Sequence, residues 1–357
     1  MTGYDFSGGN DMESMNRELQ RIQDLSSRAL KRNAFAKQYG AIIVFIVLLV
    51  INLVITPNFI SMTTVWNLII HSTTVMCVAM GMTFVIAVAG IDISVGATMA
   101  LCATITAMLA ELGFPILFCL FIGVLFGAGI GAFIGALTVK FKIQPMVLTL
   151  AMMIILRSVA RMVSNAKTVQ IVDESFLALS GTSIGGVPVQ LVYVLILAVV
   201  FFIIAERTVF GKSVEAIGNN ATAAKLSGIR SDRIIIFVYV LLGILAALAG
   251  ILTVSRTNNC NPSSVGTSME MNAIAAVVIG GTSMSGGKPR VLGTVVGCFI
   301  ISIIAMTVNM NGIDTAWSML LEAIIIILAV YIQSDKSVKS GKMRGRRAKT
   351  RAAAKEA

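Results

Sequence analysis

The polar stretch Glu215–Ile229, EAIGNNATAAKLSGI, separates two long apolar runs of the sequence. It contains a glutamate, a lysine and two adjacent asparagines, so it is too polar to cross a bilayer. Asn219 or Asn220 is expected to cap a helix over 221–226, because an asparagine side chain accepts hydrogen bonds from the free amides of a first turn. Gly228 is a natural left-handed stop for that helix. The stretch therefore predicts a short capped helix on the water side of a membrane protein, with small side chains that allow another surface to approach closely.

The composition places the chain in a membrane. Of its 357 residues, 57% are hydrophobic and only 13% are charged, and the mean hydropathy is +0.89. Soluble domains carry about 25% charged residues, whereas apolar runs of about 20 residues, as found repeatedly here, are typical of membrane spans. We therefore predict one transmembrane domain over 40–333, preceded by a polar tail over 1–39 and followed by a basic tail over 334–357.

The apolar runs predict an all-α, polytopic membrane helix bundle of about ten transmembrane segments. Segment 271–281 is too short to span alone at about 1.5 Å per residue, so it is either re-entrant or continued by its glycine-rich neighbours. An eight-span arrangement with a second re-entrant segment keeps the termini on the same sides. The ten segments are 40–56, 65–89, 93–111, 115–138, 144–163, 189–206, 234–255, 271–281, 291–309 and 315–333.

Glycines recur at four-residue spacing in the fourth segment, at Gly127, Gly131 and Gly135. This spacing removes side chains from one helix face and lets a neighbouring backbone approach closely. It predicts a compact bundle and by itself says nothing about transport.

The distribution of basic residues predicts the orientation. With the N-terminus inside and ten crossings, the inner loops and the C-terminal tail hold 18 Lys and Arg, and the outer loops hold four at most. This bias puts both termini and the Glu215–Ile229 stretch in the cytoplasm. The basic tail fits contact with anionic lipid better than nucleic acid, because no aromatic residue is interleaved with its charges. The 1–39 tail is either an amphipathic helix on the inner membrane face or a loosely ordered segment.

Residues for catalysis, metal binding or ATP binding are not apparent. The single histidine, His71, has no partner suggested by spacing, and the five cysteines have neither metal-site nor disulfide spacing. The Gly-Lys pairs at 287–288 and 211–212 form no phosphate loop, since Thr282 and Glu206 stand where that loop requires glycine. We therefore expect a non-enzymatic chain that binds no metal and no cofactor of its own.

Two glycine-bounded interruptions resemble one another, Gly90–Gly96 (GIDISVG) and Gly281–Gly287 (GTSMSGG). Paired interruptions of this kind often mark a transport pathway. Asp92 either caps the helix that follows it or takes part in solute contact or gating. Glu322, in the last segment, is the one other acid that qualifies as lying in the membrane interior, and two such acids are few for a proton-coupled pump. The predicted pathway or helix-break residues are Gly90, Asp92, Ser94, Gly96, Gly281, Ser283, Gly286 and Gly287.

These motifs together resemble a known family. Phe210–Lys212 (FGK), followed by EAIGNN and AAKLSGI up to Ile229, resembles the cytoplasmic coupling segment of ribose/xylose-type sugar permeases of bacterial ABC importers, a family that also contains branched-chain amino-acid permeases. Gly90–Gly96 resembles the family's break between its second and third helices. Ile274–Ser283, together with the glycines that follow it, resembles the late glycine-rich segment of the family. The resemblance covers about 40–333. This sequence departs from the family's usual residues at Met146, Ala151, 288–290 and Glu322. These departures bear on the identity of the substrate more than on the fold.

The resemblance implies a type II ABC-importer-like permease for a monosaccharide in the bacterial plasma membrane. It implies a second permease copy, identical or different, an ATPase subunit below that uses ATP and Mg, and a periplasmic or lipid-anchored sugar-binding protein above. A nucleoside or branched-chain amino-acid permease is the alternative, and an ion-coupled carrier is a more distant one. The residues implied to couple to the ATPase are Glu215, Ala216, Gly218, Asn219, Asn220, Ala223, Ala224, Leu226, Ser227 and Gly228.

Overall fold

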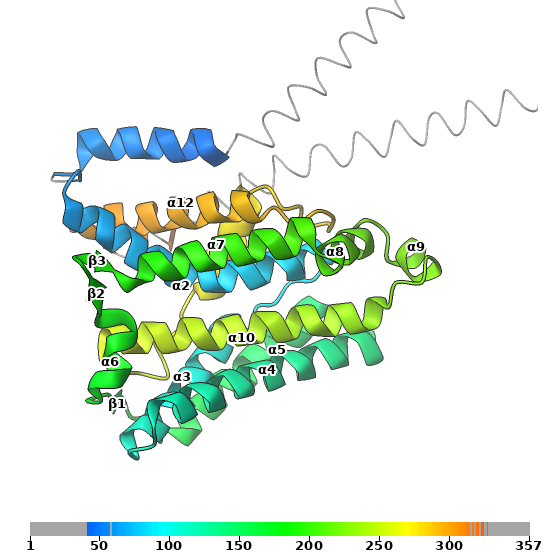
Figure 1. Cartoon of the computed structure of the whole chain (residues 1–357), viewed down its shortest axis with the longest axis horizontal. Coiled ribbons are helices and arrows are strands. Elements are labelled where there is room, and N and C mark those ends of the chain that lie inside the picture. The colour runs from blue at the N-terminus through cyan, green and yellow to red at the C-terminus, as the bar shows by residue number, and fades with distance from the viewer. Residues whose placement is uncertain are drawn as a thin grey trace, which may run out of the picture.

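The computed structural model describes residues 41–57, 59–314, 316–317, 319–320, 323–324 and 327. The 1–39 and 334–357 tails and Glu322 lie outside the described residues. Short helices and strands connect the long helices (Figure 1). In chain order the elements are the helix Ala41–Ile55, α2 (Met62–Ala87), α3 (Val95–Glu111), α4 (Ile116–Lys140), α5 (Pro145–Val163), β1 (Val169–Gln170), α6 (Glu174–Gly181), β2 (Ser183–Ile184), β3 (Val187–Pro188), α7 (Val189–Arg207), α8 (Val209–Asn219), α9 (Ala221–Leu226), α10 (Ser231–Thr257), β4 (Asn259–Cys260), α11 (Met269–Ile279) and α12 (Val291–Met310).

Six helices in the described part of the chain are long and apolar enough to cross a membrane: α2, α4, α5, α7, α10 and α12. The helix Ala41–Ile55, α3 and α11 are apolar but shorter. The chain is thus a polytopic α-helical membrane protein, while the predicted number of about ten spans stays a prediction. The expected shortness of the 271–281 segment is confirmed, because α11 has only 11 residues.

The prediction of an all-α chain omitted two small strand pairs. β1 pairs antiparallel with β4, with Val169 opposite Cys260, and β2 pairs with β3. Each strand has two residues, too few to leave a periodic signal in the sequence. They arise because the backbone groups of the connecting segments need hydrogen-bond partners. The β1–β4 pair ties the segment after α5 to the segment after α10.

Helix α10 lies at the centre of the bundle and packs closely against α4. A Cβ added at Gly127 would lie 2.4 Å from the carbonyl oxygen of Gly243, and one added at Gly131 would lie 2.2 Å from that of Tyr239. Such distances exclude any side chain at these two positions of α4. The close packing predicted from the four-residue glycine spacing is confirmed.

The helix Ala41–Ile55 is joined to α12 by a group of four polar side chains. Asn52 Oδ1 accepts hydrogen bonds from Thr307 Oγ1 at 2.6 Å and from Thr56 Oγ1 at 3.0 Å. Asn311 Nδ2 donates to Thr56 Oγ1 at 3.0 Å. Most other side chains of this helix are exposed and apolar. These hydrogen bonds therefore hold the helix Ala41–Ile55 against α12, although this helix buries little of its own surface.

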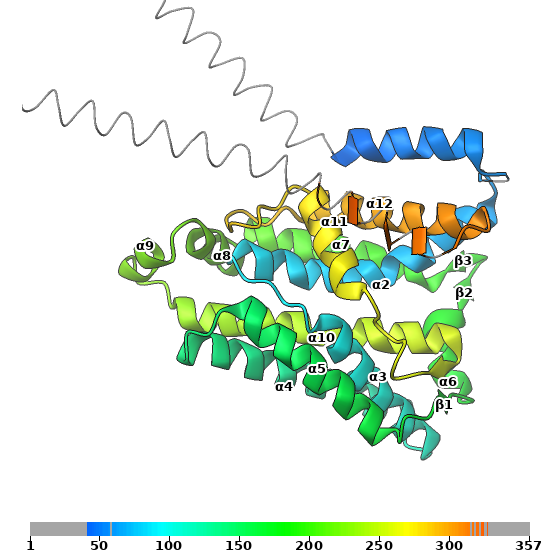
Figure 2. The same ribbon diagram turned by 180° about the vertical axis from the view of Figure 1, so that it is seen from behind.

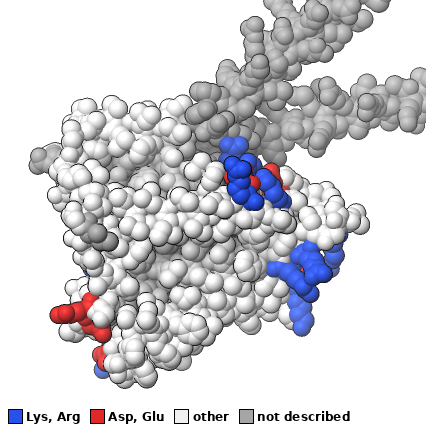
Figure 3. All heavy atoms as spheres, viewed as in Figure 1, with Lys and Arg blue, Asp and Glu red and all other residues white. Residues whose placement is uncertain are grey.

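The two ends of the bundle differ in structure and charge. Helices α8 and α9 lie at one end, and α6 with the strand pairs lies at the other (Figures 1 and 2). Lys and Arg side chains gather at the α8–α9 end (Figure 3). Acidic side chains gather at the α6 end, where Asp173 caps α6 and Glu174 follows in its first turn.

Candidate functional site

The stretch Glu215–Ile229 forms the C-terminal part of α8 and all of α9. Asn220 is the N-cap of α9, because its Oδ1 accepts a hydrogen bond from Ala223 N at 3.0 Å. Gly228, just after α9, has φ +83° in the left-handed region. The predicted capped helix over 221–226 and its glycine stop are confirmed, and the choice between the two asparagines falls on Asn220.

Gly218 of α8 is wedged between two backbone segments that are distant in sequence. A Cβ added there would lie 1.9 Å from Ala87 O, at the end of α2, and 2.4 Å from Gly287 N, before α12. Those two groups are themselves bonded, since Gly287 N donates to Ala87 O at 2.9 Å. A Cβ on Gly286 would meet Gly218 O at 2.7 Å. We call this meeting of Ala87, Gly218, Gly286 and Gly287 the glycine junction.

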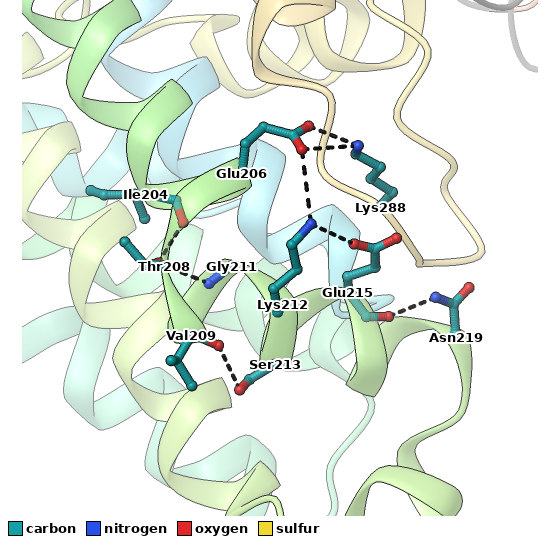
Figure 4. Close-up of polar contacts among 10 residues, drawn as sticks. All are labelled: Ile204, Glu206, Thr208, Val209, Gly211, Lys212, Ser213, Glu215, Asn219 and Lys288. Atoms are coloured by element: carbon teal, nitrogen blue, oxygen red, sulfur yellow. Dashed lines mark hydrogen bonds and ion pairs between the residues drawn. The ribbon is translucent and has the colours of Figure 1, made fainter.

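A chain of ion pairs lies beside the glycine junction (Figure 4). Lys288 Nζ lies 2.8 Å from Glu206 Oε1. Lys212 Nζ lies 3.8 Å from Glu206 Oε2 and 3.8 Å from Glu215 Oε2. Asn219 Nδ2 donates to Glu215 O at 2.9 Å within α8. These partly exposed pairs add little stability, but they link the ends of α7 and α8 to the segment that precedes α12.

The ten residues that the sequence assigned to coupling divide into two sets. Ala224 is buried, and Glu215, Ala216 and Gly218 are half-buried, so these four attach the segment to its own bundle. The remaining six are exposed. Leu226 stands out among them, since 86% of this apolar side chain is accessible. The exposed set is Asn219, Asn220, Ala223, Leu226, Ser227 and Gly228.

Asp92 lies in the break between α2 and α3 and is buried. Its Oδ1 accepts from Ser94 N at 2.8 Å and from Ser94 Oγ at 2.6 Å. Ser94 is the N-cap of α3, but its side chain makes no capping hydrogen bond. Asp92 therefore closes a local turn ahead of α3. A Cβ on Gly90 in the same break would lie 2.8 Å from Tyr239 Oη, so α10 packs directly on this backbone.

The second interruption is a glycine-dependent loop between α11 and α12. Gly281, Gly286 and Gly287 have φ values of +90°, +86° and +118°, which side-chain-bearing residues rarely adopt. Ser283 Oγ accepts a hydrogen bond from Ser285 N at 3.3 Å. Since Gly287 bonds to Ala87, the second interruption meets the end of α2, three residues before the first interruption, at the glycine junction.

Sequence reasoning missed a second polar site, which contains Arg157 of α5 and Glu270 of α11. Arg157 Nη1 donates to Pro262 O at 3.3 Å and also to Val265 O. A Cβ on Gly96 would lie 2.5 Å from Glu270 Oε2. The signal was present in the sequence as an arginine inside an apolar segment, but it was counted only as an outer-loop charge.

The other side chains with possible chemistry show no catalytic arrangement. His71 Nδ1 lies 3.5 Å from Arg256 Nη1, and His71 lines a cavity of about 380 Å³ between α2 and α12. All five cysteines are free and buried. In the described ranges, no group of three His, Cys, Asp or Glu side chains is placed to hold a metal ion.

Comparisons with known proteins give one consistent match. Residues 64–330 match the family described as branched-chain amino acid transport system / permease component. The chain is 34% identical to the ribose import permease protein RbsC of Escherichia coli (strain K12), over 88% of this chain and 99% of that protein. It is 33% identical to RbsC of Bacillus subtilis (strain 168), over 84% and 94%. It is 32% identical to the L-arabinose ABC transporter permease protein AraH of Azospirillum brasilense, over 82% and 86%. No solved structure matches the chain.

Proposed function

The chain belongs to the branched-chain amino acid transport system / permease component family, and we propose that it is the permease subunit of an ATP-binding-cassette importer for a monosaccharide of the ribose class. Relatives named as ribose and L-arabinose permeases support this substrate class. The matches cover most of each chain, so the likeness extends to the whole permease. A nucleoside or branched-chain amino-acid permease of the same architecture is the alternative.

In this proposal the α8–α9 end faces the cytoplasm of a bacterium, and the α6 end faces outward across the plasma membrane. The gathering of Lys and Arg at the α8–α9 end supports this orientation (Figure 3). Both termini are then cytoplasmic, and the basic 334–357 tail is placed beside anionic lipid. A second permease copy completes the membrane unit, and a sugar-binding protein delivers its cargo at the α6 end.

The observation that carries the proposal is the exposed surface of α9. Leu226 is 86% accessible although it is apolar and belongs to α9, at the end where Lys and Arg gather in Figure 3. An exposed apolar side chain on a short helix, whose other exposed residues include Ala223 and the C-cap Ser227, fits a docking contact. We assign this contact to a separate ATPase subunit, which binds ATP and Mg and carries out the hydrolysis. The permease itself is not an enzyme.

The glycine junction supplies the physical link between docking and transport. If closure of the ATPases displaces α8, Gly218 moves the backbones of Ala87 and Gly287, because no side chain lies between them to absorb the motion. The displacement then reaches the ends of α2 and α12 at the two interruptions. Such rigid-body transmission is a usual basis of alternating access.

The test uses matched charge substitutions at the two ends. Leu226→Asp places a carboxylate in the proposed docking contact, and Val172→Asp does the same to an 82% accessible valine near α6. We expect Leu226→Asp to prevent copurification with the ATPase subunit, and Val172→Asp to leave it unchanged. Undiminished ATPase copurification and uptake in Leu226→Asp would contradict the coupling proposal. Uptake of leucine and not ribose by the reconstituted importer would favour the alternative substrate.

A further inference from the structure

Two groups of basic side chains lie at the α8–α9 end of the bundle, one at α8 and one over the neighbouring ends of α4 and α10 (Figure 3). In the group at α8, Lys212 and Lys288 pair with Glu206. The side chains of the second group are all exposed. We call this second group the basic patch, and its members are Lys140, Lys142, Arg230 and Arg233.

The basic patch carries an excess of positive charge. Residues 138–147 and 229–235 contain four Lys and Arg and a single acid, Asp232. Within the described part of the chain, none of these four cations takes part in an ion pair, in contrast to the lysines at α8. Like charges that are held close together repel one another, so an anion from outside the chain would be stabilised here.

Glycine packing holds the two ends that carry the basic patch together. The contacts between α4 and α10 described above meet rising positions of α4 with falling positions of α10, so the two helices are antiparallel. A Cβ added at Gly135 would lie 2.8 Å from Ile236 Cα, which extends these contacts toward the α8–α9 end. Lys140 lies about 7.5 Å beyond Gly135, and Arg233 lies about 4.5 Å beyond Ile236 in the same direction. Basic residues of both helices therefore meet at one place.

The face of α4 that ends in Lys140 carries exposed aromatic rings. Phe126, Phe133 and Lys140 follow one another at seven-residue spacing, so they lie on one face of the helix. The two phenylalanines are 47% and 53% exposed. At the end of this face, Lys140 Nζ lies 5.8 Å from the ring centroid of Phe141, which is also exposed. The face is about 21 Å long from Phe126 to Lys140, enough for one leaflet of a hydrocarbon core of about 30 Å.

We propose that the basic patch binds the phosphate headgroup of an anionic phospholipid in the leaflet next to the α8–α9 end, with the acyl chains on the Phe126–Phe133 face of α4. Arginine and lysine both bind phosphate oxygens, arginine through two parallel hydrogen bonds. An acidic protein surface would match the charges of the patch but not the apolar face directly below them. Arg230 is two residues from Gly228, the stop of α9, so the bound lipid supports the base of the docking helix. This inference goes beyond the proposed function and holds whichever solute is carried.

The experiment measures the binding of phosphatidylglycerol to the purified full chain in detergent by native mass spectrometry. Phosphatidylcholine, which has no net charge, is the comparison lipid and should bind more weakly. One variant combines Lys140→Gln with Lys142→Gln, and another combines Arg230→Gln with Arg233→Gln. Each variant loses two cations, so the dissociation constant for phosphatidylglycerol should rise about thirtyfold, or about fivefold for each charge. The basic 334–357 tail is the same in every variant, so its own attraction for lipid cancels in the comparison.

The matched control combines Arg161→Gln with Lys167→Gln, which removes two exposed cations after the middle of α5, toward the opposite end of the bundle. It should bind phosphatidylglycerol as the parent chain does. Parent-like affinity in both patch variants would overturn the inference, and so would equal affinity of the parent for the two lipids. Displacement of the lipid by inorganic phosphate would show a site for a free anion, and would also overturn it.

Two further measurements separate lipid binding from folding and from docking. Melting temperatures without added lipid should be the same in all variants, because the substituted side chains are exposed and outside ion pairs of the described residues. If one patch variant fails to fold, the other decides the result. Both patch variants should copurify with the ATPase subunit, since Leu226 is unchanged. Loss of the ATPase with parent-like lipid binding would assign the patch to that partner and overturn the inference. A parent chain that binds no ATPase would refute the proposed function and leave the lipid result standing.

Discussion

Replacing Gly218 with alanine tests the glycine junction directly. The added methyl group would lie 1.9 Å from Ala87 O and 2.4 Å from Gly287 N, and both neighbours are backbone atoms that cannot rotate away. Overpacking of this kind costs about 1–3 kcal/mol. Separating the two segments also breaks the hydrogen bond from Gly287 N to Ala87 O, worth about 1 kcal/mol. We expect Gly218→Ala to lower the free energy of unfolding by about 2–4 kcal/mol.

Gly129→Ala is the matched control, because Gly129 lies in α4 with nothing within 4 Å of an added Cβ. Alanine should stabilise that helix by about 0.5–1 kcal/mol. Thermal unfolding in detergent and ribose uptake in proteoliposomes would be measured for both variants. Gly218→Ala should melt lower and lose uptake even where the ATPase still copurifies. Equal melting temperatures and equal uptake in the two variants would show that the backbones at the junction are not in the contact described.

Two further predictions concern side chains at opposite ends of the bundle. A double-mutant cycle of Lys288→Met with Glu206→Gln should give a coupling free energy below about 1 kcal/mol, because both side chains are partly exposed. This coupling should decrease with added salt. A large coupling that does not depend on salt would mean that the pair is desolvated. Thr307→Val removes the 2.6 Å hydrogen bond to Asn52. It should cost about 0.6 kcal/mol, the average for hydrogen bonds between membrane helices, and at most about 1.7 kcal/mol. Unfolding in mixed micelles with increasing SDS would measure that cost, and an unchanged midpoint would contradict the proposed hydrogen bond.

The features predictable from the sequence were those set by neighbouring residues. The cap of α9 by Asn220 and the stop at Gly228 follow from local conformational preference. The boundaries of the first nine predicted segments were close to those of the helices, since long apolar runs between polar breaks leave few alternatives for a membrane chain. Most of the tenth predicted segment, 315–333, lies outside the described residues. The role of Asp92 was harder to predict, because a carboxylate before a helix can bond to the helix or, as here, to the turn that precedes it.

The features that were not predictable depend on contacts between distant segments. Nothing near Gly218 in the sequence indicates that it meets Ala87 and Gly287, because glycine in a helix also occurs without such contacts, as at Gly129. The position of Glu270 likewise depends on α3 and α11 meeting at their N-termini. A single sequence gives the chemical type of these residues but not their neighbours.

The glycine junction also has a consequence for biosynthesis. Gly287 follows Gly218 by 69 residues, so at about 5–20 residues per second the ribosome needs about 3 to 14 s to supply it after Gly218. During this interval the nascent chain has α8 and the end of α2, but it lacks the backbone that closes the contact between them. The α8–α9 surface therefore gains its final support late in translation, after α10 and α11 have been made. Until Gly287 has been made, an incomplete subunit lacks the backbone contact that supports the proposed docking surface.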